Sequence, residues 1–224
     1  PAFRALFFGL TRNGLSTNPD DVPLAGFLAF LRFYTVMRRD AWRFEYLPNG
    51  GGDVCEKLSA KITQHGGALK FKSRVKRVEK DDDWIVQYES DGIPASIRSR
   101  FVILASDSPS AGSIIRSSFP SDEGAGSPRP YFFPHGLAHA VIRLWFGKQP
   151  RRHPEAGIFS GDFVMHNFFW LDKIYDEYRK WSEKTGGACI EVHVYGPEDV
   201  LKQSDAVLLT NVLTDFYRAF PELR

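Results

Sequence analysis

The sequence has few cysteines, no long apolar run and no initiating methionine, and each absence narrows what the chain can be. Its two cysteines, Cys55 and Cys189, lie far apart and match no metal or redox spacing, so we expect small buried hydrophobic residues in a reducing compartment. No run of about 18 apolar residues could span a bilayer, and no basic segment precedes an apolar leader. We therefore expect a cytoplasmic protein or one that contacts a membrane peripherally.

The two ends of the sequence look like internal positions of a longer protein. The chain begins at Pro1 and ends at Arg224, directly after a helical pattern. We therefore expect an internal fragment.

An excess of charge of one sign is also missing. The chain has 29 Lys and Arg against 27 Asp and Glu, a net charge of +2, so its overall balance does not favour nucleic acid. The one basic run, residues 70–80, lies on one face of an alternating segment and is balanced by the aspartates at 81–83. This pattern indicates a solvated strand face, and we expect no nucleic-acid partner.

The glycine fingerprint of a dinucleotide-binding unit, Gly-x-Gly-x-x-Gly between a strand and a helix, is absent from the sequence. Residues 124–126 (Gly-Ala-Gly) do not replace it. No apolar strand precedes them, and Pro128 and Pro130 prevent a helix from following.

A different glycine cluster does precede a helical pattern. Gly50, Gly51 and Gly52 are followed by Asp53, which can cap a helix. Bare main-chain N–H groups at the positive end of a helix suit an anion. On the motif alone, however, a flexible turn is the more frequent structure.

The glycine cluster opens a regular order of elements over residues 47–107. A helix carries Val54, Leu58 and Ile62 on one face and ends at Gly66 and Gly67. Two strands follow on either side of the aspartates at 81–83, and a third follows the turn at 90–92. Residues 101–105 are apolar without alternation, which is typical of a strand covered on both faces.

This order resembles the middle of flavin-dependent amine-oxidase and carotenoid-desaturase chains. The resemblance implies FAD as the cofactor, with the three glycines at 50–52 beside the flavin. It further implies that Val75 holds the adenine end through its main-chain N–H and C=O groups, and that the strand ending at Ala105 and Ser106 passes behind the dinucleotide. From the residue alone, Val75 would be a core valine.

The flanking regions add helices and strands. Residues 24–37 carry an apolar stripe at helical spacing, and the Ser, Gly and Pro content of residues 117–134 predicts a surface loop. Further patterns predict strands at 138–147, 158–170 and 187–195, a helix at 172–184, and two helices after Pro197, the second capped by Ser204.

We thus predict a mixed α/β (α+β) fold. The resemblance divides it into substrate-domain helices at 1–46, a segment of the FAD-binding domain at 47–107, and the mixed sheet and flanking helices of the substrate domain at 108–224.

Two groups of histidines have spacings that could serve chemistry. His135 and His139 have the spacing of a helical zinc pair, but Pro134 and Gly136 oppose a helix there, so we predict no metal site. Strand alternation places Glu191, His193 and Tyr195 on one face, where hydrogen-bonded partners on a wet sheet face are more frequent than catalytic groups.

Residues 161–170 surround a His-Asn pair with large apolar side chains, which fits core packing first and an apolar slot second. The longer segment 158–170, together with residues 187–197 and 219–223, is similar to the carotenoid-desaturase branch, including isorenieratene-synthase-like chains. That similarity implies contacts between an apolar isoprenoid substrate and Phe163, His166, Phe168, Phe169 and Trp170.

The function implied by the resemblance is FAD-dependent desaturation of a long isoprenoid (carotenoid). A hydride passes from an allylic carbon to the flavin, the neighbouring carbon loses a proton, and a quinone or similar acceptor reoxidises the flavin. No residue is assigned a catalytic role, and we expect the fragment alone to be inactive. Phe7, Phe8 and Leu10 motivate the hypothesis of peripheral membrane contact.

Two alternatives stay open. One is another flavoenzyme of the same fold, which oxidises an amine or a protoporphyrinogen. The other is a non-catalytic module that binds an apolar ligand.

Overall fold

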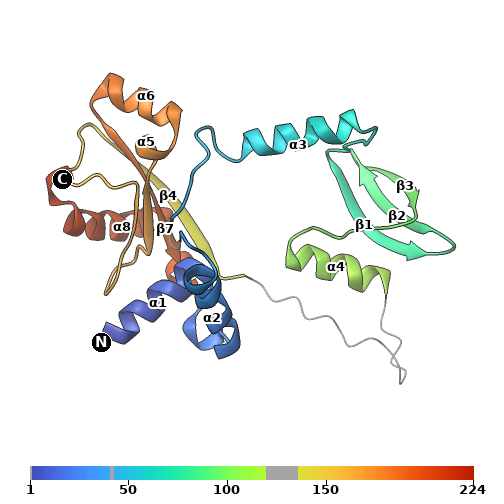
Figure 1. The fold of residues 1–224 in the computed structure, drawn as a ribbon, viewed down its shortest axis with the longest axis horizontal. Coiled ribbons are helices and arrows are strands. Elements are labelled where there is room, and N and C mark those ends of the chain that lie inside the picture. Colours follow the sequence, from blue (N-terminus) through green and yellow to red (C-terminus); the bar gives the residue numbers. More distant parts are fainter. Residues whose placement is uncertain (1, 41–42, 120–135) are drawn as a thin grey trace. The chain divides into compact units, whose positions relative to one another are not determined.

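The computed structural model describes residues 2–40, 43–119 and 136–224. The chain folds into helices and antiparallel sheets, which confirms the predicted mixed α/β class (Figure 1). It forms two compact units, with boundaries inside helix α3 and at residue 135. We call Pro1–Cys55 with Gly136–Arg224 the split unit and Glu56–His135 the inserted unit. The assignment of residues 47–107 to a flavin-binding domain stays a prediction.

The split unit contains a four-stranded antiparallel sheet in the order β4-β7-β6-β5. Residues Phe168, Trp170, Ile190, Val192 and Val194 of this sheet are buried. Its strands are β4 (His139–Phe146), β5 (Ala156–Ile158), β6 (Asn167–Trp170) and β7 (Ala188–Tyr195).

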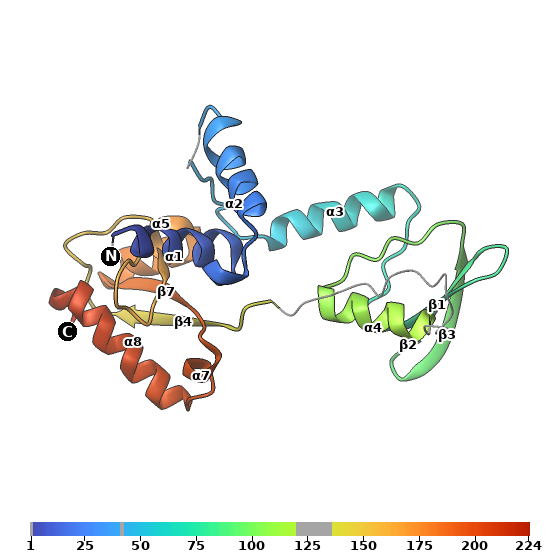
Figure 2. The ribbon, with the colours of Figure 1, turned by 90° about the horizontal axis from the view of Figure 1, so that it is seen from below.

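The main core lies between one face of this sheet and the C-terminal helix α8 (Asp205–Ala219) (Figure 2). Leu208, Val212 and Phe216 recur at four-residue steps along α8 and are buried, as their spacing predicts. Ser204 is the N-cap residue of α8, as predicted, although its side chain makes no capping hydrogen bond.

The remaining helices of the split unit follow the sequence patterns with one difference. The apolar N-terminal segment is helical, and Phe7 packs on Phe27 with ring centroids 5.1 Å apart. The helix predicted at 172–184 is broken at Tyr175 into two. These helical segments are α1 (Ala2–Leu15), η1 (Pro19–Asp21), α2 (Leu24–Leu31), η2 (Arg32–Val36), α5 (Leu171–Ile174), α6 (Asp176–Thr185), α7 (Glu198–Leu201) and η3 (Pro221–Leu223).

The inserted unit is a three-stranded meander with a helix packed against its first strand. Strand β1 pairs with β2 and β2 with β3, both antiparallel, and Val78 N–H donates to Ser118 Oγ of α4 (2.8 Å). Helix α3 crosses the unit boundary. The elements are α3 (Gly52–Gln64), β1 (Ser73–Lys80), β2 (Trp84–Ser90), β3 (Ile93–Ser99) and α4 (Ser108–Ser118).

The prediction of a strand at residues 101–105 is wrong. These residues have no regular secondary structure, and Phe101 and Ile103 are 80% and 90% exposed. A strand needs a partner for its N–H and C=O groups, and none of the strands in the described residues pairs with this segment. The apolar composition therefore did not suffice to form a strand.

Three further expectations change. The strand predicted at 158–170 is two short strands, β5 and β6, joined by a loop in which Gly161 has φ of +96°. The loop predicted at 117–134 begins inside α4, which Asp107 caps by accepting from Ser110 N–H (3.0 Å); residues 120–134 lie outside the described residues. Cys189 is buried as expected, but Cys55 is exposed, because α3 has no buried residue.

No helix in the described ranges is long and apolar enough to cross a membrane.

Candidate functional site

The glycines predicted to lie beside a flavin form an accessible turn at the start of α3. Gly50 N–H donates to Leu47 O (2.9 Å), and Gly50 has φ of +80°, a region that glycine adopts without a side-chain clash. A Cβ added to Gly51 or Gly52 would meet nothing within 4 Å. The main chain here is therefore open to a ligand, although nothing in the turn itself requires one.

Val75 turns its main-chain groups to the outer edge of β1. Ser90 and Ile93 flank a two-residue turn, so these two residues exchange hydrogen bonds. Tyr88, two positions earlier, therefore also directs its N–H and C=O to β3. Val75 is opposite Tyr88, so its own N–H and C=O face away from β2.

The other two predicted cofactor residues, Ala105 and Ser106, are exposed and precede α4 without regular structure. They belong with Val75 to the inserted unit, whereas Gly51 lies in the split unit.

The five predicted substrate residues go to three different places in the split unit. Phe168 and Trp170 are buried in the core, and both rings pack against Phe220 of the C-terminal region. Phe169 points to the opposite face, where its ring centroid lies 5.4 Å from that of His193. Phe163 and His166 line a cavity. Strand alternation separates Phe169 from Phe168 and Trp170, since neighbouring residues of β6 face opposite sides, whereas Phe163 and His166 precede β6 in the chain.

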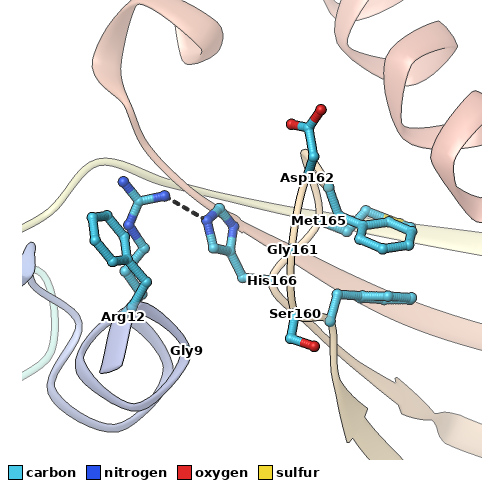
Figure 3. A pocket seen from close by; sticks show the side chains of 10 residues that line it. Gly9, Arg12, Ser160, Gly161, Asp162, Met165 and His166 are labelled. Carbon is cyan, nitrogen blue, oxygen red and sulfur yellow. Dashed lines mark hydrogen bonds between the residues drawn. The ribbon is translucent and has the colours of Figure 1, made fainter. Parts of the chain in front are cut away.

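The cavity lies between α1 and the loop that joins β5 to β6, and its volume is about 470 Å³ (Figure 3). Arginine and histidine side chains meet at one end of it, and aromatic rings form much of the remaining wall. The residues that line it are Phe8, Gly9, Arg12, Phe159, Ser160, Gly161, Asp162, Phe163, Met165 and His166.

The polar end of the cavity is built by Arg12 from α1 and His166 from the loop before β6. Arg12 Nη1 lies 2.8 Å from His166 Nε2, as Figure 3 shows. On the other side of the ring, Tyr195 N–H lies 3.1 Å from His166 Nδ1. The main-chain N–H of His166 donates to the main-chain oxygen of His193 (2.8 Å), which fixes the position of His166 against β7.

Burial keeps His166 neutral. Removal of the ring from water, reinforced by the Arg12 charge, lowers the pKa of His166 to about 4. Burial also lowers the pKa of Arg12. An arginine nevertheless stays charged at neutral pH, so the polar end of the cavity carries one positive charge.

A second polar group lies on the outer face of the sheet, where the sequence predicted it. Glu191 accepts from His193 Nε2 (3.0 Å) and from Arg143 Nε (2.7 Å), and these bonds lower the pKa of Glu191. His193 Nδ1 lies 3.1 Å from His139 Nε2. Each group in this chain has a partner, which matches the prediction of hydrogen-bonded residues on a sheet face.

Of the two histidines with the spacing of a zinc pair, His139 lies in β4, and His135 lies outside the described residues. Within the described parts of the chain, no group of three or more His, Cys, Asp or Glu side chains could hold a metal ion.

Arg12 is the site residue that sequence reasoning missed. It occurs in an apolar N-terminal segment with no motif around it, and 154 positions separate it from His166. An isolated arginine after a run of phenylalanines is the only signal the sequence offers, and it does not point to a partner.

Comparison of the chain with known protein families finds no match, and comparison with curated proteins finds none either.

Proposed function

We propose that this chain forms part of an FAD-dependent oxidoreductase that desaturates a long isoprenoid. The observation that carries the proposal is the exposed apolar segment at residues 101–105, directly after the meander. Phe101 and Ile103 are almost fully exposed, although the segment has the composition of a buried strand. In the resembled flavoproteins, the strand at this position passes behind the dinucleotide.

The topology of the chain is a second support. The inserted unit interrupts the split unit, whose two chain segments fold together. Such an insertion is what the resemblance implies for a chain that alternates between a substrate domain and a cofactor domain. Topology supports the proposal by analogy, because one fold serves many functions.

The local structure at two predicted contacts is compatible with FAD. Val75 presents main-chain N–H and C=O groups that its own sheet does not use, and Gly51 leaves space for close approach to the main chain. When bound, FAD supplies the hydride acceptor for the reaction. The protein's part is to hold the isoprenoid, exclude water and orient the allylic carbon, for which aromatic walls are suitable.

A non-catalytic module for an apolar ligand is the second candidate. The cavity beside Phe159, Phe163 and His166 favours it, since the cavity lies wholly within the split unit and needs no flavin.

The reading frame on both sides of these residues gives the first test of the proposal. We expect a Gly-x-Gly-x-x-Gly sequence after a strand pattern upstream, and a protein expressed from the complete frame that binds FAD and loses its flavin absorbance with a carotene under anaerobic conditions. A frame without the fingerprint, or a complete protein that binds no FAD, would contradict the proposal.

Val75 allows a sharper test in that complete protein. Val75→Pro removes an N–H that β2 does not use, so the meander should persist while FAD affinity falls about tenfold or more. Val75→Thr keeps the N–H and should bind FAD as the parent does. Equal FAD affinity in both variants would exclude the main-chain contact at this position.

A further inference from the structure

The contact between Arg12 and His166 contains more hydrogen-bond donors than acceptors. A neutral imidazole has one N–H and one acceptor nitrogen, whereas both of its neighbours, the Arg12 guanidinium and the Tyr195 amide, can only donate. In either tautomer, therefore, the ring N–H faces another N–H donor, that of Arg12 or that of Tyr195. Protonation of the ring would leave no acceptor at all.

The guanidinium itself is also poorly satisfied. Arg12 Nε is buried and has no hydrogen-bond partner in the described part of the chain. Arg12 Nη2 reaches only Asn18 Oδ1, at 3.5 Å, and among the described residues no carboxylate forms an ion pair with Arg12. A partly buried charge without a counter-ion is costly, so the site lacks an acceptor group.

From these contacts we infer that the cavity binds the carboxylate of an apolar ligand, with Arg12 as the principal donor. A carboxylate has the planar pair of oxygens that matches the guanidinium fork. Its oxygens would accept hydrogen bonds from Arg12 Nε and from the Arg12 N–H group that faces His166. The aromatic walls formed by Phe8, Phe159 and Phe163 would cover the apolar body of the ligand.

The surrounding charges favour a single negative charge over a phosphate group. Asp162 lines the same cavity, and Figure 3 shows that its carboxylate does not point at Arg12. Another arginine, Arg218, is already paired with Asp215 at 3.3 Å and donates a hydrogen bond to the main-chain oxygen of Asp162. Among the described residues, Arg12 is thus the one cation that lines this cavity, which would leave a dianion under-compensated.

This inference does not depend on flavin, and it is tested with the 224-residue chain alone by calorimetric titration at neutral pH. The probes are decanoate, decanol and inorganic phosphate. We expect decanoate to bind about 10- to 100-fold more tightly than decanol, because only the carboxylate accepts hydrogen bonds from the guanidinium. We expect no measurable binding of phosphate at the same concentrations.

The matched variants are Arg12→Gln and Arg179→Gln. Arg179 is an exposed arginine of α6 paired with Asp176, so its loss removes a charge away from the cavity. Arg12→Gln should bind decanoate no better than decanol, whereas Arg179→Gln should behave as the parent chain. Near-ultraviolet circular dichroism checks that each variant is folded.

Several results would overturn the inference. Equal affinity of the parent chain for decanoate and decanol would do so without any variant, even if Arg12→Gln fails to fold. Undiminished decanoate binding by Arg12→Gln, or phosphate binding that requires Arg12 in a chain that does not bind decanoate, would also do so. None of these results bears on FAD binding, which is measured separately.

Discussion

The two units of the chain differ in how much apolar surface they bury. The split unit has a continuous core between its sheet and α8, in which Trp170, Val192 and Phe216 are fully buried. Among the described residues of the inserted unit, the buried apolar side chains are few and none is aromatic: Val78, Ala111 and Ile114. The inserted unit keeps its shape with far less hydrophobic stabilisation.

The difference shows that strands and a core arise from different features of a sequence. The meander of the inserted unit is defined by turn residues and strand pairing, including a two-residue turn at Asp91 and Gly92 with positive φ at both positions. The sheet of the split unit is defined in addition by what covers it. Substitutions that shorten buried apolar side chains should therefore destabilise the split unit most. Substitutions that disturb turns should change the stability of both units by similar amounts.

The largest expected effect is in the core of the split unit. Phe216→Ala removes a fully buried ring that stacks on Phe146 and Phe220, both with centroids 4.9 Å away. We expect a loss of about 3–5 kcal/mol in the free energy of unfolding, measured by urea titration. The matched variant in the inserted unit is Phe71→Ala, at an exposed phenylalanine, with an expected change within about 0.5 kcal/mol. Similar losses in both variants would contradict the difference between the units.

The next effect concerns a buried carboxylate. Asp172 accepts from Cys189 N–H (3.1 Å) and lies 3.0 Å from His153 Nε2. Asp172→Ala leaves a buried N–H without an acceptor, so we expect a loss of about 2–3 kcal/mol in thermal or urea unfolding. Glu89→Ala in the inserted unit breaks an exposed pair with Lys76 and should cost about 0.5 kcal/mol or less.

A pH effect should be specific to the split unit. The pKa of His166 is lowered in the folded state from 6.5 to about 4, so the unfolded chain takes up more protons as the pH falls through this window. Folded stability is therefore complete above pH 6.5 and decreases as the pH falls toward 4. We expect the contribution to be about 1.5 kcal/mol after allowance for solvent screening of a partly exposed ring.

Urea unfolding followed across that pH range measures the effect. His166→Asn should flatten the dependence, whereas His65→Asn, at an exposed histidine of the inserted unit, should leave it unchanged. A parent chain whose stability rises as the pH falls from 6.5 to 4 would show that the assigned sign is wrong.

The smallest effect tests turn chemistry in the inserted unit. Gly66 ends α3 with φ of +79°, so Gly66→Ala should cost about 1 kcal/mol in the free energy of unfolding. Gly51→Ala is the control, because Gly51 lacks a positive φ and a Cβ there meets nothing within 4 Å. A Gly66→Ala chain as stable as the parent would mean that the end of α3 contributes little.

Local signals predicted much of the fold. The glycines around α3, the turns of the meander and the alternation in β7 are features of neighbouring residues, and the structure agrees with each. Asp53, expected to cap α3, lies instead inside its first turn, because the helix begins at Gly52. The resemblance to flavoproteins named Phe163 and His166, which do line a cavity. It named Phe168 and Trp170 together with them, but these two residues lie on the core face of β6, whereas Phe163 and His166 precede the strand.

Burial and long-range contacts were beyond these signals. The run at residues 101–105 was apolar enough for a core strand, yet a strand also requires a partner, which a local pattern does not contain. Helix α4 is absent from the prediction, although Asp107, which precedes Ser108 and Pro109, caps a helix start there.

The sequence by itself determined where α3, the turns and strands of the meander, and β7 lie, because turn geometry, helix-ending glycines and side-chain alternation depend on residues close together in the chain. The tertiary structure alone decided that Arg12 meets His166 and that these two donors lack an acceptor. That pairing depends on how α1 packs beside the loop before β6, and packing joins residues whose distance along the chain carries no information about contact.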